Sequence, residues 1–169
     1  MIAFFNKHPV VFAIISALVF LFFVIMAKKR MTRIEMYSTS LFAIILTYTV
    51  DQILGEQYHL YGYFHEQAEY KDFIVILGIY PAINILFLNY FPFHKKITFK
   101  ILYFILWSAF ALFYEWLSVK LGLFFYHGWK LWYSAPIYPI LYLLLIANLM
   151  FTRKINKTNN KENLSIGKP

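Results

Sequence analysis

Long apolar runs alternate with short polar segments along this chain, and that pattern predicts membrane helices. A helix needs about 20 mostly apolar residues to cross the hydrocarbon core of a bilayer, because each residue advances about 1.5 Å along its axis. We therefore expect an all-α integral membrane protein, a bundle of five transmembrane helices in a single domain over residues 1–152. The predicted spans are 8–27, 37–54, 73–93, 99–119 and 134–152.

The positions of the basic residues predict the orientation of this bundle. Lys and Arg resist translocation and gather on the cytoplasmic side of a membrane. Of the 16 Lys and Arg residues, 12 follow the first, third and fifth spans, and four lie on the opposite side. We therefore expect the N-terminus outside and the C-terminus inside, an alternation that requires an odd number of spans. The first run is long and no small-residue cleavage site follows it, so we interpret it as a retained span and not as a signal peptide.

Composition agrees with a membrane protein and excludes several other classes. Hydrophobic residues make up 61% of the chain and charged residues only 14%, whereas soluble domains carry about 25% charged residues. The net charge of +8 sits in short clusters between apolar runs, so we expect no nucleic-acid partner. The chain has no cysteine, and we expect no cofactor and no metal site. Residues 153–169 are polar and basic, and we expect a disordered cytoplasmic tail there.

The two connections predicted on the outer side are unusually aromatic. Residues 55–72 read GEQYHLYGYFHEQAEYKD, and residues 120–133 read KLGLFFYHGWKLWY. Aromatic rings favour the headgroup region of a bilayer, so one interpretation is a plain aromatic belt. The other is a cover over an outward-facing cavity.

Asp51 and Glu115 are the acids that fall inside predicted spans, two and four. A charge within the bilayer costs at least about 2.5–3.5 kcal/mol near its centre, so such residues usually face the bundle interior or a wet cavity. Both lie three or four residues before the outer ends of helices that run in the same direction, which predicts equal depth. Each also lies on a helical face of small or polar residues. Asn84, near the middle of span three, needs a polar partner as well.

Two hypotheses for these acids stay open from the sequence. One is interhelical packing, with each acid bound to Lys130, to His127 or to tyrosine hydroxyls. The other is a ligand-binding or proton-handling site below the outer surface. The candidate ligand-binding residues are Asp51, Glu115, Asn84, His127, Trp129, Lys130, Trp132, Tyr133 and Tyr138. No set of residues with a recognisable catalytic arrangement is present, so the sequence does not decide whether the chain is an enzyme.

Several motifs resemble a family of small, uncharacterised five-helix membrane proteins of spore-forming Gram-positive bacteria. The similar segments are DQILG at 51–55, YGYF at 61–64, FLNYFPF at 87–93 and YEWLSVKLGLFFYHGWKLWYSAPIYP, within roughly residues 36–150. The resemblance implies a multi-pass protein of the bacterial plasma membrane and carries no activity. It places the following residues inside family motifs: Asp51, Asn89, Glu115, Trp129, Lys130, Tyr133 and Pro139.

Three functions fit this sequence. The first is binding of a lipid or a small amphipathic ligand in an outward-facing pocket that contains Asp51 and Glu115. The second is an intramembrane enzyme that uses a carboxylic acid as proton donor on a lipid or isoprenoid. The third is a substrate-capture or accessory subunit of a transporter. We expect membrane lipids as partners in each case, and we place ligand binding first because polar groups converge without a catalytic set.

Overall fold

The computed structural model describes residues 5, 7–64 and 70–166, with side chains up to Thr158. Within these residues the chain is 78% helical with five α-helices. Two of them are extended by π-helical segments, labelled η. The elements are α2 (Pro9–Met26), α3 (Arg33–Asp51), η1 (Gln52–Gln57), η2 (Ile74–Ile79), α4 (Tyr80–Tyr90), α5 (Ile97–Lys120) and α6 (Leu131–Ile166). Each predicted span falls on one of these continuous helices, so the predicted helical architecture is confirmed.

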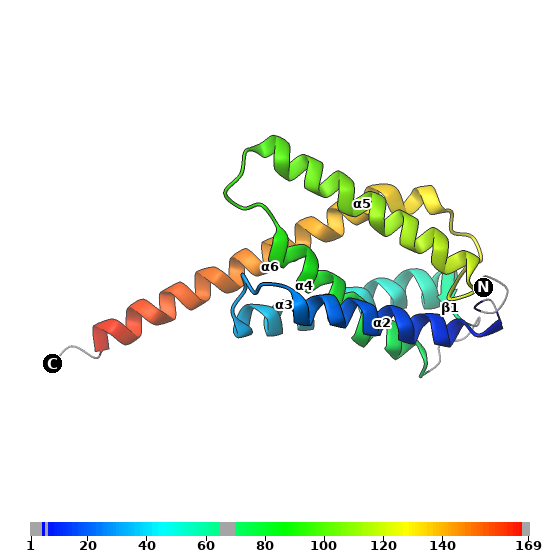
Figure 1. Cartoon of the computed structure of the whole chain (residues 1–169), viewed down its shortest axis with the longest axis horizontal. Coiled ribbons are helices and arrows are strands. Elements are labelled where there is room, and N and C mark those ends of the chain that lie inside the picture. The colour runs from blue at the N-terminus through cyan, green and yellow to red at the C-terminus, as the bar shows by residue number, and fades with distance from the viewer. Residues whose placement is uncertain (1–4, 6, 65–69, 167–169) are drawn as a thin grey trace.

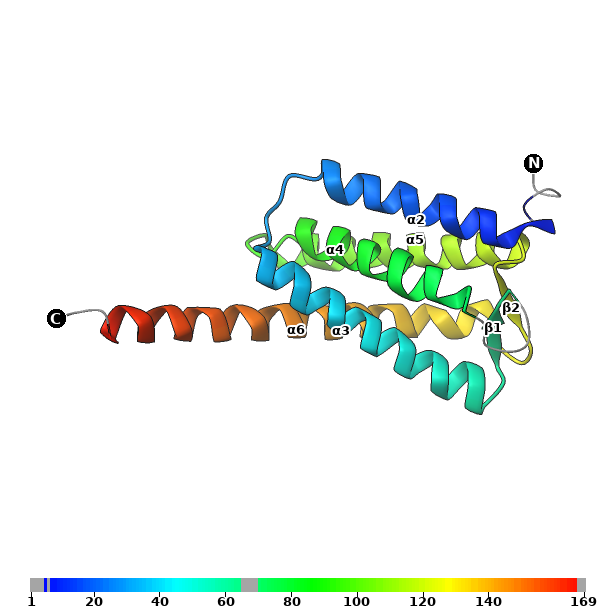
Figure 2. The same cartoon turned by 90° about the horizontal axis from the view of Figure 1, so that it is seen from below.

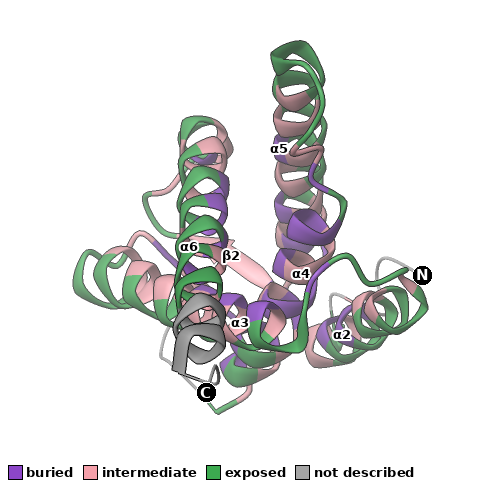
Figure 3. Ribbon diagram, turned by 90° about the vertical axis from the view of Figure 1, so that its left-hand side faces the viewer, coloured by how far each residue is buried: buried purple, intermediate pink, exposed green. Residues whose placement is uncertain are grey.

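Three of the helices are long and apolar enough to cross a membrane. They are α2, α5 and the Leu131–Thr158 part of α6, while Ile74–Tyr90 forms a shorter apolar helix. Many apolar side chains of α2 and α5 are exposed, and much of the ribbon of both helices has the green of exposed residues in Figure 3. Exposed Leu, Ile and Phe on this scale suit contact with lipid, because a protein surrounded by water would bury them.

The helices run up and down, so alternate connections gather at opposite ends of the bundle (Figures 1 and 2). The connections after α2 and α4 and the end of α6 lie at one end. The other end carries β1 (Tyr61–Tyr63) and β2 (Phe124–Tyr126), which pair antiparallel with Gly62 opposite Phe125. The two aromatic loops, whose paired residues lie 61 to 65 positions apart in sequence, are thus joined in one two-stranded sheet across this end of the bundle.

The π-helical segment η2 has a cause in the sequence. Pro81 has no backbone N–H, and its ring excludes the carbonyl of the residue four positions earlier. The helix before it is wound with wider spacing, so that the Tyr80 N–H reaches the carbonyl of Val75, five residues back. Pro81 therefore does not break the helix from Ile74 to Tyr90; it widens its first turns. π-Helical turns of this kind often occur at functional sites.

Close packing of small residues joins α2 to η2. Ala13 is fully buried and Ala17 nearly so. A Cβ atom placed on Gly78 would lie 3.1 Å from the Cβ of Ala17, so the backbones approach closely only because Gly78 lacks a side chain. Ala13 and Ala17, four residues apart, therefore share the packing face of α2.

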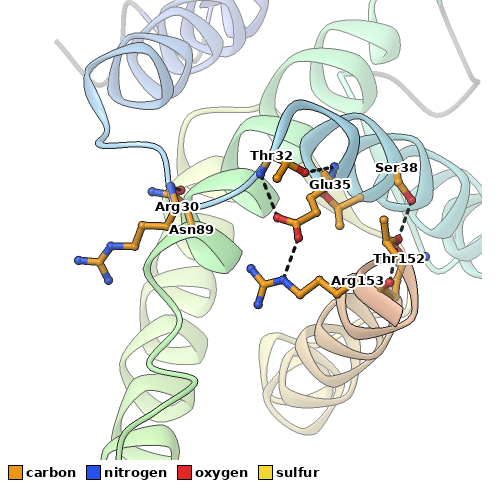
Figure 4. A network of polar contacts seen from close by, with 9 residues as sticks. Arg30, Thr32, Glu35, Ser38, Asn89, Thr152 and Arg153 are labelled. Atoms are coloured by element: carbon orange, nitrogen blue, oxygen red, sulfur yellow. Dashed lines mark hydrogen bonds and ion pairs between the residues drawn. The ribbon is translucent and has the colours of Figure 1, made fainter. Parts of the chain in front are cut away.

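A polar network fastens the end of the bundle opposite the strands (Figure 4). Glu35 accepts the Thr32 N–H, and Thr32 Oγ1 accepts the Glu35 N–H, which together cap α3. The other carboxylate oxygen of Glu35 lies 3.0 Å from Nε of Arg153 on α6. Asn89, at the end of α4, accepts the Arg30 N–H at 2.7 Å and donates to the Lys28 carbonyl at 2.9 Å. This network ties α3, α4, α6 and the α2–α3 connection together.

The predicted disorder from residue 153 onward differs from the structure. Helix α6 continues without a break to Ile166, and residues 167–169 lie outside the described part. The prediction assumed that a polar segment cannot order itself. Here the segment extends an apolar helix that is already formed, and adding residues to a helix is far easier than starting one. The first strong stop signals after it are Gly167 and Pro169.

Candidate functional site

Asp51 is the last residue of α3, and two tyrosines of β1 bind it. The Tyr61 hydroxyl donates to its Oδ1 and the Tyr63 hydroxyl to its Oδ2, both at 2.9 Å. Alternate residues of a strand point to the same face, so Tyr61 and Tyr63 can reach one carboxylate together. The sheet at this end of the bundle therefore binds both oxygens of the Asp51 carboxylate through two tyrosine hydroxyls.

A third tyrosine, Tyr80, extends this contact into the helix bundle. The hydroxyls of Tyr63 and Tyr80 lie 2.9 Å apart. A tyrosine hydroxyl has one proton, and that of Tyr63 is directed to Asp51. The Tyr80 hydroxyl is therefore the donor to Tyr63, and the chain of hydrogen bonds runs from Tyr80 through Tyr63 to Asp51. Tyr80 is the first residue after η2, so the wider turns before Pro81 set its position.

Glu115, on α5, accepts three hydrogen bonds from hydroxyl groups. Tyr126 of β2 and Ser134 donate to Oε1 at 2.6 and 2.8 Å, and Tyr138 donates to Oε2 at 2.7 Å. The Trp129 indole N–H, which can only donate, bonds the oxygen of Ser134 at 2.9 Å. Ser134 therefore accepts from Trp129 and must direct its own proton to Glu115. Glu115 is only 7% exposed.

The tyrosines of the two strands remain protonated donors over the physiological pH range. Burial, and then the neighbouring Asp51 carboxylate, raise the pKa of Tyr61 and of Tyr63 well above the ordinary value. Burial and the hydrogen bond to Glu115 likewise raise the pKa of Tyr126. Burial disfavours a phenolate, and a neighbouring carboxylate disfavours it further.

Both acids line one cavity of about 180 Å³ between the helices and the strands. For comparison, an engineered apolar cavity of about 150 Å³ takes up benzene. Polar groups gather at the strand end, where Tyr61, Tyr63 and Trp129 line the cavity beside the acids. Toward the bundle centre most of the lining is apolar and comes chiefly from α3 and α6: Ala43, Leu46, Leu141 and Leu145. The cavity is therefore polar at the strand end and mainly apolar toward the bundle centre, where Asn84 is a polar exception.

Asn84 on α4 is a further polar group of this cavity. Its side chain is only 2% exposed, and its Nδ2 donates to the Thr39 carbonyl at 2.8 Å. That bond fixes the orientation of the amide, because a carbonyl can only accept. The Oδ1 atom is buried and has no hydrogen-bond donor among the described residues. A buried acceptor without a donor costs free energy, and a ligand could supply the missing donor.

The other predicted ligand-binding residues divide into two groups. Trp129 and Tyr138 line the cavity beside the acids. The remaining four lie outside its lining on the surface: His127, Lys130, Trp132 and Tyr133. Trp132 is 64% exposed, and the Lys130 ammonium lies 5.1 Å from the centre of its ring. These four residues follow β2 and are exposed, whereas Trp129 in the same segment lines the cavity, a difference that spacing along a loop does not reveal.

Four of the five hydroxyl groups that bind the two acids were not among the residues predicted from the sequence. They belong to Tyr61, Tyr63, Tyr126 and Ser134. The alternation of tyrosines in YGYF was a signal for a strand with two rings on one face. Ser134 was the first residue of the last predicted span and was not among the candidate ligand-binding residues. Nothing local in the sequence could show that these loops reach the acids.

The hydrogen bonds to the two acids bear on both hypotheses for their role. The hydroxyls join α3 to β1 and α5 to α6 and β2, as the packing hypothesis requires. The two acids nevertheless face one cavity and are not separated on opposite flanks. No three His, Cys, Asp or Glu side chains within the described ranges are grouped to hold a metal ion.

Comparison with known proteins finds no match among family models, curated protein sequences or solved structures. The resemblance noted from the sequence motifs stays a prediction. The functional argument therefore depends on the cavity and its chemistry alone.

Proposed function

We propose that this chain is a multi-pass membrane protein that binds a lipid or other amphipathic molecule in the cavity between Asp51 and Glu115. In this proposal it spans the bacterial plasma membrane five times, and the strands face the cell exterior. The bacterial location follows from the motif resemblance. The five spans are inferred from the charge distribution and the helix packing, and the ligand from the polarity of the cavity.

The distribution of charge supports the proposed orientation. The basic clusters at 28–33, 95–100 and 153–157 all belong to the end of the bundle that lacks the strands (Figure 2). Anionic lipids and the translocation machinery keep such clusters in the cytoplasm. α4 packs against α2, α3 and α6, and α3 packs against α4 and α6, so both would cross the bilayer with these helices.

One observation carries the ligand proposal: a single cavity whose two ends differ in polarity. Its lining on the α3 side extends from Ala43 to Leu54. Eleven residue steps correspond to about 16 Å along a helix, enough for an extended apolar tail. The acids, the tyrosines and Trp129 lie at the strand end, where an amphiphile in the outer leaflet would hold its head group. A ligand pocket of this type is mostly apolar with a few convergent polar groups.

Mass spectrometry of the protein extracted in a mild detergent tests the ligand proposal. We expect a small amphipathic molecule to be retained by the wild type. Ala43→Phe should lose it, because a ring would fill the apolar end of the cavity. Leu144→Phe is the matched control: it adds the same ring to an exposed face of α6 outside the cavity. Equal retention by both variants, or none by the wild type at any detergent concentration, would contradict binding in this cavity.

The absence of cysteine from the chain allows a direct test of the orientation, through the crossing of α5. Lys120→Cys lies at the strand end of α5, and Lys96→Cys lies just before its other end. A membrane-impermeant thiol reagent applied to intact cells should label residue 120 and leave residue 96 unlabelled until the cells are lysed. The reverse result would overturn the orientation.

A further inference from the structure

We propose that the head group accepted by this cavity is an ammonium group, so that the ligand is a cationic amphiphile. This inference rests on the proposed ligand-binding function and narrows its chemical class. Three independent features of the cavity lead to it: its unused acceptors, its charge and its aromatic walls.

The two acids offer unused hydrogen-bond acceptor positions at the strand end of the cavity. A carboxylate has about four lone-pair positions. Asp51 accepts two hydrogen bonds and Glu115 accepts three, which leaves about two and one positions. The protons of the hydroxyls bound to the acids are already directed to them, while the Tyr114 and Ser118 hydroxyls, which also line the cavity, have no partner among the described residues and could donate or accept. A ligand head that donates hydrogen bonds therefore fits the free positions on the acids.

The charge of the cavity lining also favours an ammonium head group. Two carboxylates line the cavity, and none of the described residues that line it is a Lys, Arg or His. Hydroxyl donors satisfy the hydrogen bonds of a carboxylate but do not neutralise its charge. A buried charge is normally paired with an opposite one. A phosphate or carboxylate head would add a third negative charge, whereas an ammonium would supply the missing positive charge.

Aromatic rings at the polar end favour the same class of ligand. Tyr61, Tyr63, Phe124 and Trp129 line the cavity, and the rings of Tyr61 and Phe124 lie 4.9 Å apart. The faces of aromatic rings carry partial negative charge and attract cations, by about 2 kcal/mol or more where water is excluded. Together with the acids these rings form a site for an alkylammonium head, and the apolar end accepts its tail.

A series of ligands with the same dodecyl tail and different heads tests the inference. The heads are a primary amine, a trimethylammonium, an alcohol and a carboxylate, and affinity is measured by calorimetry on the full chain in maltoside micelles. We expect the amine to bind at least about tenfold more tightly than the alcohol, a difference of about 1.4 kcal/mol. The trimethylammonium cannot donate hydrogen bonds, so its affinity measures the contribution of the rings and the charge alone. The carboxylate should bind most weakly.

Variants at the two acids test whether their carboxylates, and not the cavity as a whole, cause the preference for the amine. Asp51→Asn and Glu115→Gln should each reduce the preference for the amine over the alcohol and leave the affinity for the alcohol almost unchanged. Ser108→Ala is the control on the same helix as Glu115: its buried hydroxyl has no hydrogen-bond partner among the described residues and lies outside the cavity lining. It should behave as the wild type.

The outcomes distinguish this inference from the function on which it rests. Equal binding of all four heads, or tightest binding of the carboxylate, would overturn the ammonium assignment and leave amphiphile binding in place. Failure of every compound to bind the wild-type protein would contradict both. The head-group series on the wild type decides the question even where a variant does not fold.

Discussion

Gly55 controls how closely the sheet approaches the first acid. It lies in η1, one turn after Asp51, and a Cβ atom there would be 3.2 Å from the carbonyl oxygen of Tyr61, inside ordinary van der Waals contact. That oxygen belongs to the backbone of β1 and cannot rotate away. The start of β1 is also fixed in place, because the carbonyl of Leu60, just before the strand, accepts the N–H groups of residues 127, 128 and 129 at 2.9–3.1 Å.

The size of the effect follows from these contacts. In Gly55→Ala, the gain of about 0.5–1 kcal/mol from replacing a helical glycine opposes an overpacking cost of about 1–3 kcal/mol. We expect a small net loss. Gly55→Val adds two methyl groups and should displace Tyr61 and Tyr63 from Asp51. Each hydrogen bond to a charged group contributes about 1.5–3 kcal/mol, so losing both costs at least about 3 kcal/mol. For a chain of this size that lowers the unfolding temperature by at least about 6–12 °C.

Thermal unfolding followed by circular dichroism in micelles measures this loss. Gly128→Ala is the matched control, since its Cβ would lie 3.4 Å from the end of the flexible Leu60 side chain. It should stay within about 0.5 kcal/mol of wild type. Gly55→Val should also lose affinity for the retained amphiphile. If Gly55→Val unfolds at the wild-type temperature, β1 is not held against η1, and the geometry of the two tyrosines at Asp51 would have to be explained in another way.

Three further predictions concern other contacts. Gly78→Val should lower the free energy of unfolding, measured by denaturation in mixed micelles, by about 1–3 kcal/mol, and adding Ala17→Gly should restore most of it. If the effects of the two substitutions simply add, the 3.1 Å contact between residues 17 and 78 is refuted. Arg153→Met should lower the free energy of unfolding by about 1–3 kcal/mol, because it leaves the buried Glu35 carboxylate without its cation. Adding Glu35→Gln should recover part of that loss. An unchanged midpoint of denaturation for Arg153→Met alone would show that the ion pair contributes nothing to stability. Tyr63→Phe should cost about 1–3 kcal/mol with an unchanged helical spectrum, and wild-type stability would count against the hydrogen bond to Asp51.

The helices and the level of the acids could be predicted from the sequence because both depend on short-range order. Hydrophobic runs and caps determine where a helix begins and ends, and the rise per residue then fixes how far Asp51 and Glu115 lie from its end. The need of Asn84 for a polar partner followed from burial cost in the same way. The tail was misjudged because its composition was considered apart from the apolar helix that it extends.

Hydrophobic runs and helix periodicity were thus enough to predict a bundle of apolar helices with two acids near one end. The pairing of β1 with β2, and the hydrogen bonds of Asp51 and Glu115, became visible only in the folded chain. The two kinds of information differ in their range along the sequence. Helix periodicity acts over a few residues, whereas these contacts depend on how helices cross and rotate against one another. Aromatic loops also look the same in sequence whether their rings lie in a membrane interface or turn inward over a cavity.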